Sequence, residues 1–132
     1  MAAPAEMLSD IQTQGGRILL VEDHADTAEV LGHLLSMGGY EVQIAGTLAQ
    51  ARQMCHERSF DLVLCDIGLP DGNGLEFAPI ARAACPGAKL IALTAFAMPE
   101  DVQAAEAAGF DAHVAKPVTI QSLLEHLKSP AR

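Results

Sequence analysis

The sequence is poor in aromatic and basic side chains. Trp is absent, one Tyr and four Phe are the only aromatic residues, and half of the 132 residues are hydrophobic. We therefore expect a core built mainly from Ala, Val, Leu and Ile. Eight Lys and Arg stand against 17 Asp and Glu, which gives a formal net charge of −9, and the basic residues form no cluster. This balance argues against nucleic acid or an anionic membrane surface as a partner.

Cysteines and long apolar segments are also scarce. Cys55, Cys65 and Cys85 are odd in number and form neither a CxxC motif nor a Cys/His metal spacing, so we expect reduced thiols in a cytosolic protein. No apolar run is long enough to span a membrane, and the N-terminus lacks the pattern of a signal peptide. The expected location is cytoplasmic, without membrane contact by this domain.

Apolar strands and amphipathic helices alternate along the chain from residue 17. Residues 1–16 show no sustained period and end in Gly-Gly, so we expect a flexible leader or linker there. The predicted strands are 17–21, 41–45, 62–65, 90–93 and 112–115, and the predicted helices start near Asp26, Thr47, Leu75, Pro99 and Thr119. The length fits one domain. Alternation with short connections predicts an α/β fold with a doubly wound parallel sheet.

Two of the predicted helices carry capping signals at their starts. Asp26 with Glu29, and Thr47 with Gln50, have the spacing of a capping box. Apolar positions at helical spacing predict which side chains face the core. These positions are Val30, Leu31, Leu34 and Leu35 in the first helix, Leu48, Ala51 and Met54 in the second, and Leu123, Leu124 and Leu127 in the last.

Four of the predicted strands end in charged or polar residues. These residues are Glu22-Asp23, Asp66, Thr94 and Lys116-Pro117. Each has an ordinary explanation by itself, such as a charge pair at a helix start or an Asp that forms a turn. The carboxyl ends of parallel strands meet at one edge of a sheet, however, so we expect a single shared site.

These residues, in this order, resemble the receiver domain of two-component response regulators. The motif Asp66-x-x-x-Pro70-x-Gly72-x-Gly74 after the central strand adds to the likeness. The resemblance spans Arg17 to about Lys128, which implies a receiver domain at 17–128 and a tail at 129–132. It also implies a flavodoxin-like, five-stranded parallel sheet with strand order 2-1-3-4-5 and a binding crevice where that order reverses.

Three carboxylates at one edge repel each other and favour a hard divalent cation with oxygen ligands. The resemblance implies that this ion is Mg²⁺. It further implies that Asp23 and Asp66 bind the ion directly, that Glu22 acts through water, and that the carbonyl oxygen of Gly68 is a further ligand.

The resemblance implies that Asp66 is the phosphoacceptor. The donor would be a phosphohistidine on a histidine kinase or a histidine phosphotransfer protein, and the output would be a changed contact with a downstream protein. Lys116 and Thr94 would contact phosphoryl oxygens, and Pro117 would follow a cis peptide bond that orients Lys116. The domain would be no enzyme, apart from dephosphorylating itself.

Three further positions bear on how long the phosphoryl group stays and how the domain switches. Gly68 stands two residues after Asp66, and Phe96 stands two residues after Thr94. In receivers, the side chains at these two positions influence the water that hydrolyses the acyl phosphate. Neither Gly68 nor Phe96 has a side chain that can form a hydrogen bond with that water. We therefore expect slow self-dephosphorylation. His113 stands where receivers usually carry Tyr or Phe, so it either turns inward together with Thr94 or stays outside on the edge strand. The remaining histidines are expected at the surface, and none has metal-site spacing with a second His; they are His24, His33, His56 and His126.

Other functions fit the sequence less well. A phosphatase with an aspartyl nucleophile would need a second Asp where Gly68 stands, and an interaction-only pseudo-receiver would have lost part of the acidic pocket or the lysine. A flavoprotein of this topology would need a phosphate-binding loop where Glu22-Asp23 stand. The domain is either a stand-alone receiver or the C-terminal receiver of a hybrid histidine kinase. The tail and residues 110–113 resemble those of hybrid-kinase receivers, which favours the second arrangement.

Overall fold

Five parallel strands form the central sheet in the order β2-β1-β3-β6-β7. The computed structural model describes residues 16–94, 99–116, 118–119 and 121–123. The strands are β1 (Arg17–Val21), β2 (Glu41–Ala45), β3 (Leu62–Asp66), β6 (Lys89–Thr94) and β7 (Ala112–Ala115). In chain order this is 2-1-3-4-5, so the predicted topology is confirmed. The strand order reverses between β1 and β3, and the acidic residues follow these two strands.

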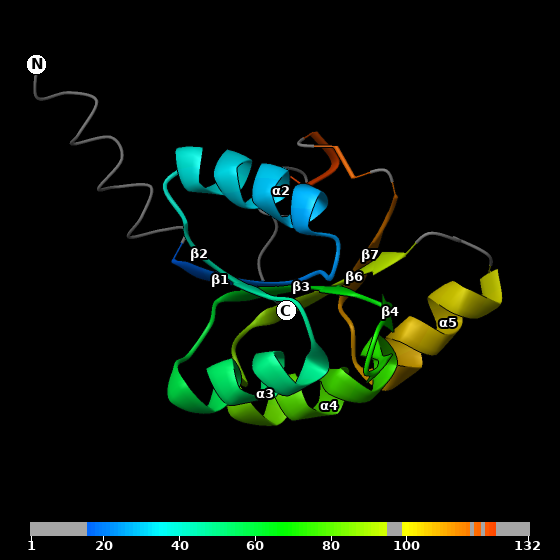
Figure 1. The fold of residues 1–132 in the computed structure, drawn as a ribbon. Helices are drawn as coiled ribbons and strands as arrows, with labels where there is room; N and C mark the ends of the chain where they lie inside the picture. Colours follow the sequence, from blue (N-terminus) through cyan, green and yellow to red (C-terminus); the bar gives the residue numbers. More distant parts are fainter. Residues whose placement is uncertain (1–15, 95–98, 117, 120, 124–132) are drawn as a thin grey trace, which may run out of the picture.

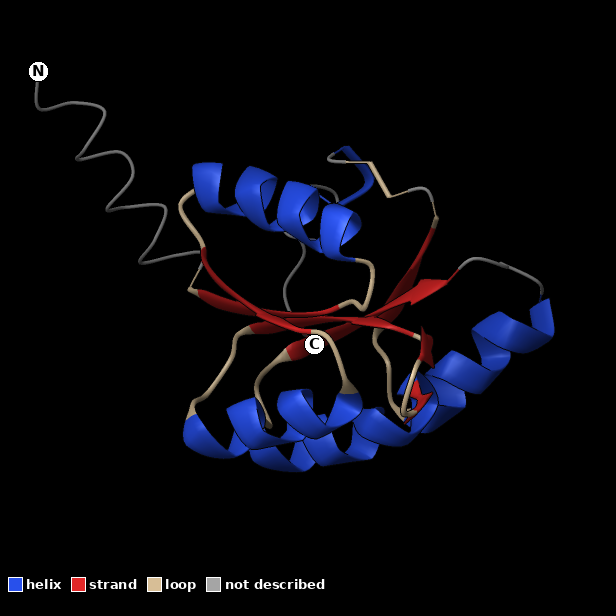
Figure 2. Ribbon diagram, viewed as in Figure 1, coloured by secondary structure: helices blue, strands red, loops and turns tan. Residues whose placement is uncertain are grey.

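Helices cover both faces of the sheet (Figures 1 and 2). Helix α2 (Ala25–Met37) packs on one face, and α3 (Leu48–Glu57), α4 (Gly74–Ala84) and α5 (Pro99–Ala108) pack on the other. Strand residues alternate between the two cores. Leu19 and Val63 belong to the core under α3, α4 and α5, whereas Ile18 and Leu64 belong to the core under α2. The central strands are apolar on both faces for this reason.

At Thr47 the predicted capping bond is present, but the return bond from the Gln50 side chain goes to the residue before the N-cap. The Thr47 hydroxyl accepts a hydrogen bond from the Gln50 N–H at 3.1 Å, and the Gln50 side chain accepts one from the Gly46 N–H at 2.8 Å. The box predicted at Asp26 is wrong. Helix α2 begins at Ala25 with His24 as its N-cap, and the His24 side chain forms no capping bond. The His24 carbonyl oxygen already accepts the first helical hydrogen bond, from the Ala28 N–H, so Asp26 lies within the first turn.

The buried side of α2 is also rotated from the predicted one. Leu31 and Leu35 are buried as expected, but Val30 is 58% exposed and Leu34 is half-buried. The buried positions are Ala28, Leu31, Gly32 and Leu35. This is the i, i+3, i+4, i+7 spacing of one helix face, and Val30 lies off it.

The remaining elements agree with the sequence prediction at most positions. Helices α4 and α5 begin within one residue of the expected starts. Leu48 and Ala51 are buried, and Met54 is half-buried. Thr119 caps the last helical turn through a 3.1 Å hydrogen bond from the Ser122 N–H, and Leu123 is buried; Leu124 and Leu127 lie outside the described residues. The sequence did not predict the short antiparallel ribbon of β4 (Gly68–Leu69) and β5 (Gly72–Asn73).

The three cysteines are free thiols buried in the core. Burial, followed by the neighbouring Cys85, raises the pKa of Cys55 to about 12. Within the part of the chain that the structure describes, no helix is long and apolar enough to cross a membrane.

Candidate functional site

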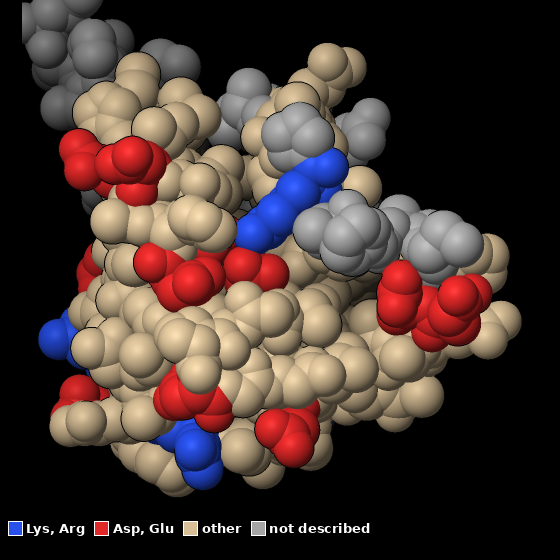
Figure 3. All heavy atoms as spheres, turned by 45° about the vertical axis from the view of Figure 1, so that its right-hand side comes forward, with Lys and Arg blue, Asp and Glu red and all other residues tan. Residues whose placement is uncertain are grey.

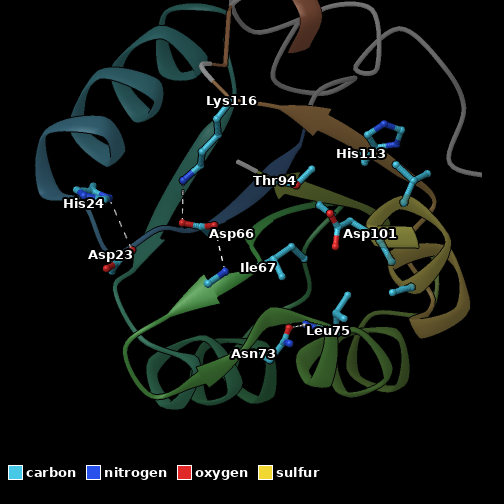
Figure 4. A pocket seen from close by; sticks show the side chains of 15 residues that line it. Asp23, His24, Asp66, Ile67, Asn73, Leu75, Thr94, Asp101, His113 and Lys116 are labelled. Atoms are coloured by element: carbon cyan, nitrogen blue, oxygen red, sulfur yellow. Dashed lines mark hydrogen bonds and ion pairs between the residues drawn. The ribbon is translucent and has the colours of Figure 1, made fainter. Parts of the chain in front are cut away.

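The strand ends carry the polar side chains to one edge of the sheet. Asp66 is the last residue of β3, Glu22 directly follows β1, and Thr94 is the last residue of β6. All three are buried, with Glu22 only 1% exposed. Asp66, Thr94, Lys116 and Asp23 line a cavity of about 470 Å³ at this edge (Figure 4). Residues up to 94 positions apart in the sequence thus share one site, as the strand-end argument predicted.

Lys116 lies between two carboxylates that come from different strands. Its Nζ is 2.8 Å from Oδ2 of Asp66 and 3.0 Å from Oε1 of Glu22. Burial by itself would lower the pKa of Lys116, but the contacts with Asp66 and Glu22 outweigh it and raise that pKa above its ordinary value. Oε1 of Glu22 is buried, and the Lys116 ammonium 3.0 Å away balances its charge.

The loop after Asp66 is packed tightly against that residue at Gly74 and is open at Gly68. The Gly68 N–H donates to Oδ1 of Asp66 at 3.3 Å. Gly68 is exposed, and a Cβ built on it would meet no atom within 4 Å. A Cβ on Gly74 would instead overlap the backbone carbonyl oxygen of Asp66. Gly74 is therefore needed for close packing, whereas Gly68 leaves space beside the carboxylate.

Asp71 is a site-supporting residue that the sequence analysis missed. Its two carboxylate oxygens accept hydrogen bonds from the Leu48 N–H at 2.8 Å and the Ala49 N–H at 3.1 Å, at the start of α3. The bond from Leu48 is the main reason that the pKa of Asp71 is lowered. The contact ties the loop after Asp66 to α3. An Asp in a turn gives no sign in the sequence that its partner lies 22 or 23 residues away.

The acid pair and the next residue form a group with metal-ligand spacing. One ligand atom each from Glu22, Asp23 and His24 lie within 4.8 Å of one another. His24 is at the surface, as predicted, but it also lines the cavity beside Asp23 (Figure 4). Asp66 is not a member of this group and is paired with Lys116. The carboxylate oxygens of this group suit a hard divalent cation such as Mg²⁺.

The switch candidates lie on the other side of the cavity. His113 is half-buried on β7, where it pairs with Ala92 of β6. His113 and Asp101 of α5 both line the cavity, on the side away from Asp23 and His24 (Figure 4). Phe96 and Pro117 lie outside the described residues, so their roles stay predictions.

The molecular surface around the site agrees with the acidic composition. Acidic side chains are spread over the face shown in Figure 3, and basic ones are fewer there. A doubly wound parallel sheet with a buried carboxylate, an ion-paired lysine and a hydroxyl at its carboxyl edge defines a class of α/β domain built for anionic or metal-bound ligands.

Comparison with known proteins identifies the family. Residues 18–128 match the model of the response regulator receiver domain, and the chain therefore belongs to this family. It is a receiver domain of two-component signalling. A response regulator receiver protein of Anaeromyxobacter is 34% identical over 109 residues, which cover 83% of this chain and 46% of that protein. The polar-differentiation response regulator DivK of Brucella ovis is 30% identical, over 85% of this chain and 93% of DivK.

Further similar proteins include one much longer sensor protein and two solved structures. The virulence sensor protein BvgS of Bordetella bronchiseptica is 34% identical over 87% of this chain, which spans only 10% of BvgS. A CheY-like receiver domain from Methanospirillum hungatei superimposes with a TM-score of 0.80 at 38% identity, over 85% of this chain and 90% of that one. A response regulator of Burkholderia pseudomallei, solved with a phosphorylated aspartic acid, a calcium ion and citrate, has a TM-score of 0.80 at 27% identity, over 86% of this chain and 66% of that one.

Proposed function

We propose that this receiver domain accepts a phosphoryl group on the carboxylate of Asp66. The observation that carries this proposal is the position of that carboxylate. It is buried at the end of β3, 2.8 Å from the Lys116 ammonium, and it faces a cavity that Thr94 also lines. The Burkholderia structure supports the proposal because a domain of the same fold holds a phosphorylated aspartic acid.

The reaction transfers a phosphoryl group from nitrogen to oxygen. A carboxylate oxygen of Asp66 attacks the phosphorus of a phosphohistidine, an O–P bond forms, and the P–N bond breaks with the electron pair returning to the imidazole. Lys116 releases its contact with Asp66 and moves its charge to a phosphoryl oxygen, and the Thr94 hydroxyl donates to another. Asp23 and Asp66, with Glu22 through water and the Gly68 carbonyl oxygen, would hold a Mg²⁺ ion that neutralises charge on the phosphoryl group.

The donor and the output are both proteins in this proposal. The donor is a histidine kinase or a histidine phosphotransfer protein, and the product changes the contact with a downstream protein partner. We place the receiver at residues 17–128, with a leader or linker at 1–16, a tail at 129–132, and the domain in the cytoplasm. Its relatives include DivK, which it nearly spans, and BvgS, of which it spans a tenth, so both a stand-alone and a hybrid-kinase receiver have precedents.

The cavity also supports the proposed roles in lifetime and switching. The open space at Gly68 offers no side chain to hold a hydrolytic water, which favours slow self-dephosphorylation, with Phe96 as the second determinant. Thr94 and His113 lie on neighbouring strands β6 and β7. A movement of Thr94 toward the phosphoryl group would leave room on the side where His113 lies. The His113 ring then turns inward when the domain is phosphorylated.

Phosphorylation with acetyl phosphate tests the proposal. In the presence of Mg²⁺, intact-mass spectrometry should show one added phosphoryl group on the wild-type protein and on Asp26→Asn, a control at the exposed start of α2, but none on Asp66→Asn. Labelling of Asp66→Asn would contradict the assignment. A wild-type protein that takes up no phosphoryl group would contradict the proposal and favour the interaction-only pseudo-receiver.

A further inference from the structure

The β4–β5 ribbon after Asp66 is too small to hold its own position. The two strands pair antiparallel, and residues 70–71 form the turn between them. A single two-stranded hairpin is marginally stable at best in water, and this one has only two residues in each strand. The position of the ribbon therefore depends on its contacts with the rest of the domain.

Gly68 in β4 is the residue through which the ribbon reaches the site. The Gly68 N–H donates to Oδ1 of Asp66 at 3.3 Å, and the proposed function uses the Gly68 carbonyl oxygen as a ligand of the ion. Gly68 has no side chain to anchor it, and a Cβ built there would meet no atom within 4 Å. Within the ribbon it pairs with Asn73. Whatever fixes the ribbon therefore also fixes the Gly68 amide beside Asp66.

Asp71 in the turn fixes the ribbon to the start of α3. Its two carboxylate oxygens accept hydrogen bonds from the Leu48 N–H at 2.8 Å and the Ala49 N–H at 3.1 Å. The first N–H groups of a helix have no partner within the helix, and the helix dipole favours a negative charge there. Gly72 lets the turn approach α3, because a Cβ at this position would lie 2.8 Å from Cδ1 of Leu48. Two bonds from one carboxylate fix the turn in both position and orientation.

We propose that Asp71 is a positioning residue of the phosphoacceptor site, which holds Gly68 against Asp66 through the β4–β5 ribbon. The inference deepens the proposed function and rests on it, because the ion and the phosphoryl group are the ones assigned to Asp66. Helix α3, which the structure describes in full, lines no part of the cavity. It nevertheless controls the site, since a displacement of its first turn would carry Asp71 and Gly68 with it.

A set of three variants tests this role. Asp71→Ala removes both acceptors, whereas Asp71→Asn keeps one carbonyl oxygen and should rescue part of the contact. Asp61→Ala is the matched control, because Oδ2 of Asp61 accepts a 2.8 Å hydrogen bond from the Arg17 N–H at the amino ends of the strands, away from the site. Urea denaturation of each variant identifies conditions in which all of them are folded.

Two measurements report the position of Gly68 rather than the stability of the fold. The first is the NMR chemical shift of the Gly68 amide without Mg²⁺, and the second is calorimetric titration with Mg²⁺. We expect Asp71→Ala to shift the Gly68 signal and to weaken Mg²⁺ binding by about tenfold. Asp71→Asn should lie between Asp71→Ala and the wild type in both measurements, and Asp61→Ala should match the wild type.

An unchanged Gly68 signal together with unchanged Mg²⁺ affinity in Asp71→Ala would overturn the proposal. Equal changes in Asp61→Ala would overturn it as well, because they would follow from lost stability alone. Labelling of the wild type with acetyl phosphate separates this proposal from the proposed function. A wild type without labelling would refute the proposed function, whereas a shifted Gly68 signal in Asp71→Ala would still support the anchoring role of Asp71. Normal labelling of the wild type, with Asp71→Ala unchanged in both measurements, would refute only the role of Asp71.

Discussion

At the scale of single residues, the site is organised around the charge of Lys116. The ammonium balances Asp66 and the buried Glu22, and their contacts raise its pKa. A lysine with a raised folded-state pKa stabilises the fold fully below its unfolded pKa of about 10.4, and this contribution is lost as the pH rises through the folded value. At neutral pH the lysine is therefore fully charged. In the proposed function, the ammonium therefore moves from a carboxylate oxygen to a phosphoryl oxygen without a change of protonation.

Asp23 and Glu22 should differ in their effect on Mg²⁺. The Asp23 side chain is 35% exposed and can bind the ion directly, whereas that of Glu22 is fully buried against Lys116. We predict that Asp23→Ala weakens Mg²⁺ binding more than Glu22→Ala. Isothermal titration calorimetry is the suitable measurement, since the protein has no Trp to report binding by fluorescence. An equal loss of Mg²⁺ affinity in both variants would contradict the distinction between a direct Asp23 and an indirect Glu22.

Gly74 should be far less tolerant of a side chain than Gly68. A methyl group on Gly74 would overlap the Asp66 carbonyl oxygen and also lie 3.0 Å from the Ile67 Cα, whereas Gly68 has open space. We predict that Gly74→Ala lowers the free energy of unfolding by about 1–3 kcal/mol and slows phosphorylation, because Asp66 must shift. Gly68→Ala, six residues away, is the matched control and should unfold like the wild type in urea. Two variants of equal stability would contradict the close packing.

At the scale of elements, side-chain contacts join the loops around the site to neighbouring helices. Asp71 joins the loop after β3 to the start of α3, and Arg82 of α4 binds Asp111 in the connection between α5 and β7. These contacts fix the loops that surround the site, while the sheet fixes the strand ends. Both kinds of contact are open to test by stability measurements.

The Asp71 contact predicts a pH-dependent stability difference. Because the pKa of Asp71 is lowered in the folded state, its contribution is present above its unfolded pKa of about 3.9 and is lost as the pH falls through the lower folded value. Asp71→Asn should therefore be less stable than the wild type at pH 7, and the difference should shrink below about pH 4. Urea denaturation at several pH values measures this. A difference that does not vary with pH would show that the charge of Asp71 plays no part.

The Arg82–Asp111 ion pair predicts a large loss of stability. Nη2 of Arg82 is 2.7 Å from Oδ2 of Asp111, whose side chain is only 6% exposed and also accepts a hydrogen bond from the Leu90 N–H. Asp111→Ala leaves these donors without that acceptor and should cost about 3–5 kcal/mol. Glu41→Ala removes exposed pairs with two arginines and should cost at most about 1 kcal/mol. Similar urea midpoints for both variants would contradict this ranking.

At the scale of the whole molecule, the features that depend on local patterns were predictable from the sequence. The strands were visible as apolar runs, and the cap formed by Thr47 needs only a residue three positions away. The convergence of Asp66, Thr94 and Lys116 followed from one rule about parallel strands. The strand order, however, came from the resemblance to receivers, since periodicity does not determine which strands are neighbours.

What the sequence did not reveal depends on side-chain directions and on contacts between distant segments. Val30 was assigned to the core because it is apolar, but the rotation of α2 about its axis is set by packing against the sheet. Asp71 and Arg82 find partners more than twenty residues away, and no spacing signals such pairs.

The central claim is that Asp66 carries the phosphoryl group, and chemical trapping tests it most directly. Borohydride reduces an acyl phosphate on an aspartate to a homoserine, so the modified position can be read from the peptide masses. After phosphorylation by acetyl phosphate with Mg²⁺, we predict homoserine at position 66 in the wild type, none without acetyl phosphate, and none in Asp66→Asn. Homoserine at Asp23 or at another aspartate, with position 66 unchanged, would contradict the account.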